Sequence, residues 1–148
     1  MFLVILSACI LAYLTLGTHA MGIALLLRRL IRLQPLPTGV WRVAVLLLRM
    51  IWWLVLLHLI EISIWALFYL WRGCLTDAGT AFYFSGVTYT TIGYGDVVLP
   101  NPWRLLGPVE GLMGVLMCGL STGYFFVVAS RIYQASPWKA TSAPDSKG

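Results

Sequence analysis

One seven-residue stretch, T-T-I-G-Y-G-D at Thr90–Asp96, contains the residues whose types and spacing suggest a specific chemistry. Gly93 and Gly95 lie two residues apart, and glycine adopts backbone conformations that other residues avoid. If the residues between them turn suitably, successive carbonyl oxygens can point to one side of the chain. A row of carbonyl oxygens facing an axis can replace the water shell of a dehydrated cation. The stretch therefore predicts a path lined by backbone oxygens.

The rest of the chain has the composition of a membrane protein. Of its 148 residues, 60% are hydrophobic and 10% are charged, and the mean hydropathy is +0.88. Soluble domains average about 25% charged residues. Residues 1–27, 43–71 and 105–133 each contain an apolar run of the roughly 20 residues needed to cross a bilayer. We therefore expect an all-α membrane protein with three transmembrane helices.

A shorter helix is expected over residues 77–90, directly before the glycine pair. It would be about 20 Å long, which is too short to span a bilayer. Thr76 or Asp77 can cap its first turn. The chain that follows is not helical, and such backbone is tolerated inside a membrane only where it is buried in protein or lines a water-filled path. The C-terminal end of this short helix carries partial negative charge, which favours a cation on the same axis.

The remaining segments are polar and set the expected orientation. Residues 28–42 form a basic linker, and residues 134–148 are predicted to be a disordered tail. Basic residues concentrate on cytoplasmic loops, so we expect both segments in the cytoplasm and the N-terminus outside. Membrane lipids, rather than nucleic acid, are the expected partner of the +5 net charge. The T-H-A stretch ending at Ala20 is similar to a signal cleavage site, but no basic residue precedes Arg28, so a retained helix is favoured over a cleaved signal.

The T-I-G-Y-G stretch resembles the signature sequence of potassium channels, with isoleucine in place of the commoner valine. The likeness extends to the preceding A-F-Y-F-S-G-V-T-Y-T, to Asp96 and to Trp103. The chain thus resembles a small prokaryotic channel of the two-helix pore family with one extra N-terminal helix. The resemblance covers about residues 43–133, and implies outer helix 43–71, pore helix 77–90, filter 91–96 and inner helix 105–133.

The resemblance also implies a function and a set of site residues. The protein would be a homotetramer in the plasma membrane that conducts K⁺ passively, without enzymatic activity and without a cofactor. Carbonyls of the filter and the Thr91 hydroxyl would bind K⁺, and Asp96 would concentrate cations at the outer mouth. Tyr83 and Phe84 would brace Tyr94. The filter residues are Thr91, Ile92, Gly93, Tyr94 and Gly95, with Thr90 and Val87 among the supporting residues.

One departure from the family pattern concerns the support of Asp96. Some members carry a pore-helix glutamate that hydrogen-bonds the aspartate after the filter. Val87 occupies that position here, so this brace is missing and filter-based inactivation is expected to differ.

Among the ionisable residues inside the apolar segments, three are candidate modulators: His58, Glu61 and Glu110. His58 and Glu61 are three residues apart and share a helix face. Glu61 is interpreted either as a proton sensor tuned by His58 or, preferably, as a buried residue that hydrogen-bonds another helix. Glu110 is expected to face the back of the pore helix or to pair with Arg104, in a structural role.

Glycines recur along the third apolar segment. Small residues allow close helix packing in lipid, but they also weaken a helix. Gly114 or Gly119 is therefore either a packing position, which we favour, or the bend that opens the inner mouth.

Two other function classes fit parts of this pattern. A potassium transporter subunit is disfavoured because such proteins fuse several repeats with degenerate filters, whereas this chain has one repeat with an intact filter. A non-conducting accessory subunit remains open on sequence alone. The short tail leaves no room for a ligand-sensing domain, so gating by nucleotide or calcium would need a separate regulatory subunit.

Overall fold

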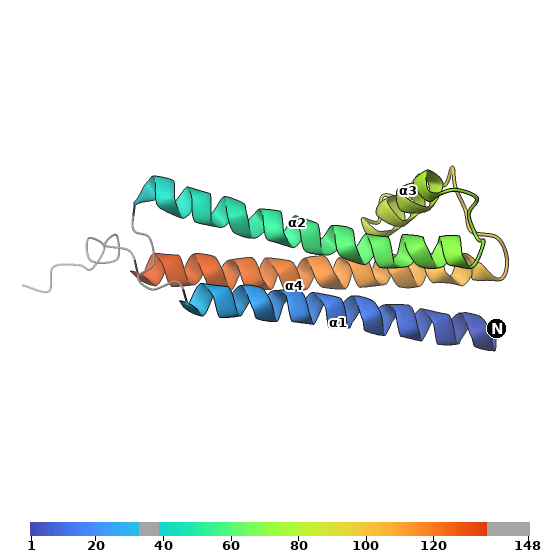
Figure 1. Cartoon of the computed structure of the whole chain (residues 1–148), viewed down its shortest axis with the longest axis horizontal. Coiled ribbons are helices and arrows are strands. Elements are labelled where there is room, and N and C mark those ends of the chain that lie inside the picture. The colour runs from blue at the N-terminus through green and yellow to red at the C-terminus, as the bar shows by residue number, and fades with distance from the viewer. Residues whose placement is uncertain (33–38, 136–148) are drawn as a thin grey trace, which may run out of the picture.

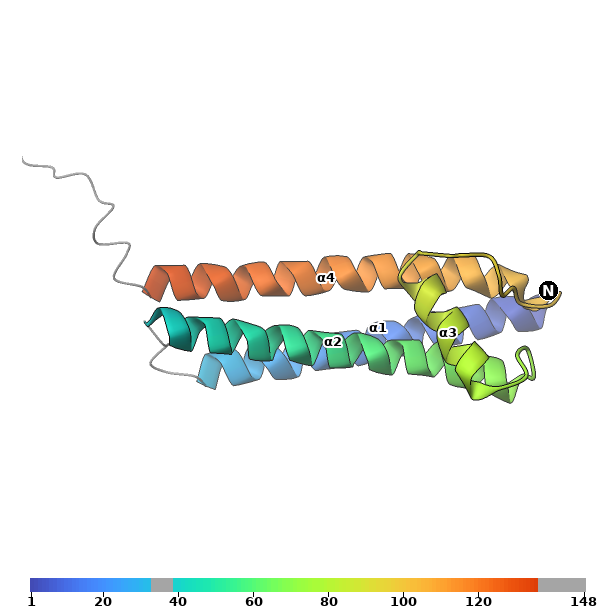
Figure 2. The same cartoon turned by 90° about the horizontal axis from the view of Figure 1, so that it is seen from above.

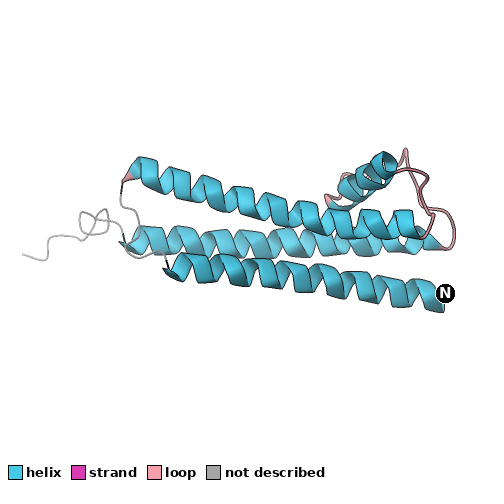
Figure 3. Cartoon of the chain, in the orientation of Figure 1, coloured by secondary structure: helices cyan, strands magenta, loops and turns pink. Residues whose placement is uncertain are grey.

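The protein is a bundle of three long helices with a fourth, short helix at one end. The computed structural model describes residues 1–32 and 39–135. The long helices are α1 (Phe2–Arg32), α2 (Val40–Trp71) and α4 (Leu106–Ala135), and the short one is α3 (Ala78–Tyr89). Within these residues the secondary structure is entirely helical, with one 3₁₀ turn, η1 (Trp103–Leu105), before α4 (Figure 3). The expected all-α fold is therefore confirmed.

Three helices are long and apolar enough to cross a membrane, as expected: α1, α2 and the continuous η1–α4 segment. They contain 31, 32 and 33 residues. Each is thus longer than the roughly 20 residues that a bilayer core requires. Large apolar side chains such as Ile5, Trp52 and Phe126 are exposed along them. Such faces suit contact with lipid rather than water, and the molecule is a membrane protein.

The long helices run side by side, and α3 lies at the end that carries the N-terminus (Figures 1 and 2). Helix α1 packs against α2 and α4, and α3 packs against the same two helices. As Figure 1 shows, α3 lies on the opposite side of the bundle from α1. The extra N-terminal helix therefore supports the back of the unit formed by α2, α3 and α4.

Two apolar clusters hold the bundle together, one near each end. The cluster at the α3 end contains aromatic residues of α2 and α3, and the far cluster joins α1, α2 and α4. Burying a large apolar side chain contributes about 1.5–3 kcal/mol. The first cluster includes Leu11, Trp65, Tyr69, Phe84 and Leu106; the second includes Leu30, Met50, Leu54, Tyr124 and Val128.

The helix ends differ from the expected boundaries on both sides of the basic linker. Helix α1 continues to Arg32 instead of ending at residue 27, and α2 begins at Val40 instead of residue 43. Leucine and arginine are good helix formers, and Leu30 is buried in the far cluster, so packing holds the extra turn of α1. Residues 33–38, in the middle of the predicted linker, lie outside the part of the chain that the structure describes.

The inner helix and the tail also shift slightly from their expected positions. Helix α4 runs to Ala135, two residues past the expected end at residue 133. Residues 134 and 135 are thus helical, and the predicted disorder of residues 136–148 lies outside the described part of the chain.

Candidate functional site

Helix α3 begins with a side-chain cap that the sequence suggested. The Asp77 carboxylate accepts hydrogen bonds from the backbone N–H of Thr80 at 2.9 Å and from its hydroxyl at 2.7 Å. These bonds lower the pKa of the Asp77 carboxyl below its usual value, because they favour the charged form. Of the two candidate caps, Asp77 is the one that is used. The cap fixes where α3 starts, and therefore where its C-terminal end delivers the chain.

The chain leaves α3 through a short hydrogen-bonded turn. The Thr90 hydroxyl donates to the carbonyl of Gly86 at 2.7 Å. The backbone N–H of Thr91 donates to Thr88, and that of Gly93 donates to the carbonyl of Val87 at 3.0 Å. Val87 therefore supports the segment through its backbone, although its side chain cannot hydrogen-bond.

The backbone of residues 91–95 alternates in handedness. The φ angles are +61° at Thr91, +53° at Gly93 and +78° at Gly95, whereas Ile92 and Tyr94 are not in the positive-φ region. Positive φ is uncommon for a non-glycine residue such as Thr91, and it is typical of functional segments. Reversing the sign of φ at every second residue turns successive peptide groups toward the same side. The geometry thus suits a line of carbonyl oxygens.

Residues 90–96 are exposed in the single chain. Ile92 retains 55% of its accessible surface and Tyr94 retains 70%. Behind the segment lies a cavity of about 220 Å³, lined by residues of α3 and of the α4 start that include Val87 and Gly107. One side of residues 90–96 is therefore not covered by the rest of the chain.

Two of the expected supporting aromatics have other partners. The Tyr83 hydroxyl donates a hydrogen bond to Asp96 Oδ2 at 2.7 Å. This bond is the main cause that raises the pKa of Tyr83 above its usual value. Phe84 is buried against Tyr69, with ring centroids 5.4 Å apart. Phe84 therefore lies in the core of its own chain, where its apolar ring is removed from solvent, and its expected contact with Tyr94 stays a prediction.

Glu110 lies against the back of α3, which was one of its two expected positions. It is fully buried, and its carboxyl accepts a hydrogen bond from the Tyr69 hydroxyl at 2.7 Å. The Ser85 hydroxyl lies 2.5 Å from Glu110 Oε1 and 2.9 Å from the carbonyl of Ile62. A serine hydroxyl carries one hydrogen. If Ser85 donates to Ile62, the contact with Glu110 needs a hydrogen from the glutamate carboxyl.

This arrangement predicts that Glu110→Gln is tolerated and Glu110→Ala is not. A glutamine amide supplies both an acceptor for Tyr69 and a donor for Ser85. Alanine leaves the Tyr69 hydroxyl without a partner and the Ser85 hydroxyl with the Ile62 carbonyl alone, which costs about 2 kcal/mol or more. Thermal unfolding of the purified protein in detergent measures the difference. Equal losses for the two variants would contradict this account of the hydrogen bonds.

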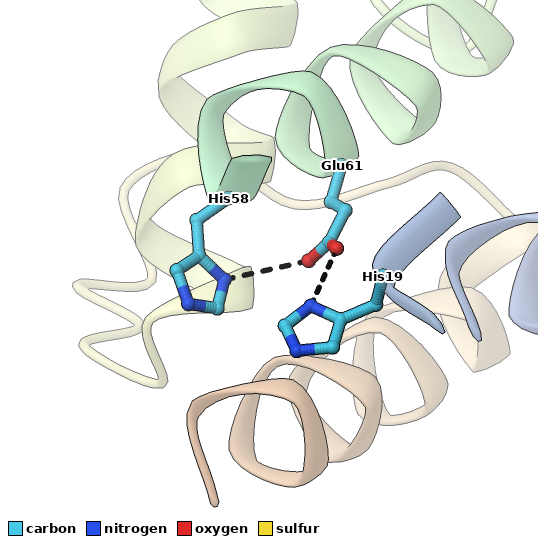
Figure 4. A group of neighbouring side chains, drawn as sticks. All are labelled: His19, His58 and Glu61. Carbon is cyan, nitrogen blue, oxygen red and sulfur yellow. Dashed lines mark hydrogen bonds and ion pairs between the residues drawn. The ribbon is translucent and has the colours of Figure 1, made fainter. Parts of the chain in front are cut away.

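The second buried carboxylate, Glu61, lies in a cluster that joins all four α-helices. Glu61 Oε1 is 2.8 Å from Nδ1 of His19 on α1. Its other oxygen accepts a hydrogen bond from the Tyr89 hydroxyl at the end of α3 and lies 3.4 Å from Nδ1 of His58. His58 Nε2 lies 3.1 Å from the Ser121 hydroxyl on α4. Figure 4 shows the Glu61 carboxylate between the two imidazole rings.

A comparison with protein families matches residues 55–131 to the ion channel family, which is a little over half of the chain. The chain belongs to the ion channel family. No curated protein and no solved structure matches it. The match runs from the middle of α2 through α3 and the glycine-paired segment to the last turns of α4. The parts of the fold that the family shares are thus those that surround the exposed segment.

Helix α1 lies outside the part that matches the ion channel family, and it holds the functional candidate that sequence reasoning missed. His19 is fully buried and contacts Glu61 across 42 positions of the chain. An ionisable residue within an apolar segment was a sufficient signal to mark His19. Its partner was not predictable, because it depends on how α1 is rotated against α2.

The two glycines considered as a hinge differ in their surroundings. A Cβ atom added to Gly114 would overlap the backbone carbonyl of Tyr89, whereas one added to Gly119 meets no atom within 4 Å. Gly114 therefore lets α4 approach the end of α3, as expected of a packing position. Gly119 carries no such constraint, and its role as a hinge stays a prediction.

Proposed function

We propose that this ion channel is selective for K⁺ and conducts it passively through a pore formed by four copies of the chain. The observation that carries the proposal is the alternation of φ at Thr91, Gly93 and Gly95, directly after a helix that is too short to cross the membrane. That backbone can present the carbonyls of residues 91–94 to one axis. Rings of such carbonyls replace the hydration shell of K⁺.

The four-fold assembly is supported by what one chain leaves exposed. Ile92 and Tyr94 are large, and both face outward. A single strand of carbonyls also cannot surround an ion, whereas four strands can. We infer that copies of the same segment cover these side chains and complete the ring. The Thr91 hydroxyl then adds one more oxygen below the lowest carbonyl ring, and Asp96 lies at the outer mouth.

The orientation in the plasma membrane is inferred from the distribution of arginine. The end of the bundle that carries α3 and the N-terminus has Arg72 and Arg104, and Arg72 lies over the Trp103 ring at 4.7 Å. The opposite end has six arginines. By the positive-inside rule the arginine-rich end is cytoplasmic, so the glycine-paired segment faces outward. The six residues are Arg28, Arg29, Arg32, Arg42, Arg49 and Arg131.

The experiment that tests selectivity is the reversal potential of the purified protein in planar bilayers, with K⁺ on one side and Na⁺ on the other. We expect reversal near the K⁺ equilibrium potential. Current that reverses near zero would contradict K⁺ selectivity while leaving a channel. Absence of current under voltage, pH and tension steps would favour the non-conducting accessory subunit instead.

A second prediction concerns Tyr83, which holds Asp96 where Val87 offers no hydrogen bond. We expect Tyr83→Phe to accelerate the decline of current during sustained recording, because it frees Asp96. The Tyr83 pKa is raised, so its hydroxyl stays protonated through neutral pH. The hydrogen bond to Asp96 is lost only as pH rises above this raised pKa. The slow decline of the unmodified channel should therefore be insensitive to neutral and mildly alkaline pH.

The matched control for this prediction is Tyr133→Phe, an exposed tyrosine near the far end of α4. It should leave the time course unchanged. If Tyr83→Phe channels also keep the original time course, the Tyr83–Asp96 bond does not stabilise the conducting segment.

A further inference from the structure

Both histidines of the chain meet in one place. The sequence contains two, His19 and His58, and they lie with Glu61 so that one ligand atom from each falls within 4.8 Å of the others. His19 and Glu61 are fully buried, and His58 is one-fifth exposed. Imidazole nitrogens and one carboxylate form the donor set typical of transition-metal sites. The rings and the carboxylate converge from α1 and α2 (Figure 4).

The distances suit a small ion. In a tetrahedral zinc site with bonds near 2.0–2.1 Å, neighbouring ligand atoms are about 3.3 Å apart. His58 Nδ1 and Glu61 Oε2 are already 3.4 Å apart. His19 Nδ1 and Glu61 Oε1 are 2.8 Å apart, so an ion that replaced the hydrogen between them would widen this contact by about half an ångström. No helix has to move far.

The surroundings supply a fourth donor and an outer partner. The Tyr89 hydroxyl lies 2.9 Å from His58 Nδ1 and also bonds Glu61, so it lies beside two of the three ligand residues. The Ser121 hydroxyl at 3.1 Å from His58 Nε2 can accept the N–H that remains when Nδ1 binds a metal. Outer hydrogen bonds of this kind orient metal-binding histidines.

His19 also has one ring nitrogen that no other group in the described residues contacts through a hydrogen bond. Its Nε2 is one of two buried polar side-chain atoms without a hydrogen-bond partner in the described residues; the other is the Tyr124 hydroxyl. Both residues line a groove of about 540 Å³ between α1 and α4. Hydrogen bonding within the chain thus leaves the His19 ring incompletely satisfied.

We propose that His19, His58 and Glu61, with the Tyr89 hydroxyl, bind a divalent transition-metal ion of the Zn²⁺ class that links α1 to the end of α3. Two nitrogen donors disfavour Mg²⁺ and Ca²⁺, which prefer oxygen ligands. His19 lies on α1, outside the segment that matches the ion channel family, whereas the other three donors lie inside that segment. The proposal does not depend on K⁺ selectivity, because binding is measured without current.

The test is Zn²⁺ binding to the full-length protein in lipid nanodiscs, purified without a polyhistidine tag and stripped with a chelator. Equilibrium dialysis with elemental analysis should give about one Zn²⁺ per chain. His19→Gln and His58→Gln should each weaken binding by at least about tenfold, the lower range seen even for outer-partner changes. Glu110→Gln is the matched control, because Glu110 is equally buried and bonded to a tyrosine but lies outside the cluster.

Cobalt provides a readout that needs no variant. Co²⁺ bound to the unmodified protein should show the visible absorption of a four-coordinate nitrogen and oxygen site. A sulfur charge-transfer band would place the ion at a cysteine such as Cys118 and overturn the proposal. It is equally overturned if the unmodified protein takes up no Zn²⁺, or if His19→Gln, folded by circular dichroism, binds Zn²⁺ undiminished.

Discussion

Gly114→Ala is expected to destabilise the protein by about 3 kcal/mol, the upper end of the usual cost of overpacking. The added methyl group would overlap the backbone carbonyl of Tyr89. A flexible side chain could rotate away from such a contact, but a carbonyl moves only with its helix. The end of α3 is also held, because the Tyr89 hydroxyl bonds Glu61 and lies 2.9 Å from His58. Relief of the overlap would therefore disrupt the packing of α3 against α4.

The measurement is thermal unfolding of the variant in detergent, with size exclusion to follow assembly. Gly119→Ala is the control on the same helix, because a methyl group there meets no atom within 4 Å. Alanine is the better helix former by about 1 kcal/mol, so Gly119→Ala should be neutral or stabilising. Similar unfolding temperatures for the two variants would show that α4 does not depend on close approach at Gly114.

We expect Gly95→Ala to abolish the K⁺-selective current proposed above. The φ angle of Gly95 is +78°, and no atom lies within 4 Å of an added Cβ, so the penalty is conformational rather than a collision. An L-residue in the left-handed region costs roughly 1–2 kcal/mol. In the proposed four-fold pore, the four copies would together incur roughly 4–8 kcal/mol, enough to favour another backbone conformation in the segment.

A D-alanine at the same position is the sharpest control. It adds the same methyl group, but a D-residue prefers positive φ, so a semisynthetic channel with D-alanine at Gly95 should keep its reversal potential. Bilayer recordings of the L- and D-alanine proteins separate backbone conformation from side-chain size. Normal selectivity with L-alanine would contradict the proposed role of the alternating backbone.

The amino-acid sequence was sufficient to predict the elements and the special segment. Three long apolar runs, one short helix and a helix cap at Thr76 or Asp77 follow from hydropathy and local hydrogen-bonding preferences, which act within a few residues of the chain. The positive φ angles of Gly93 and Gly95 agree with the conformations expected of the glycine pair. The positive φ of Thr91 was not expected, because threonine has no intrinsic preference for that region.

The partners of the buried polar residues depended on the tertiary structure. His19 with Glu61, Glu110 with Tyr69 and Ser85, and Tyr83 with Asp96 each join different elements. The long helices are apolar on nearly every side, so hydropathy does not mark which side faces a neighbour. Run length along the sequence determined which segments form helices and which can cross a membrane. Only packing decided how each helix is rotated, and therefore which polar groups meet inside the bundle.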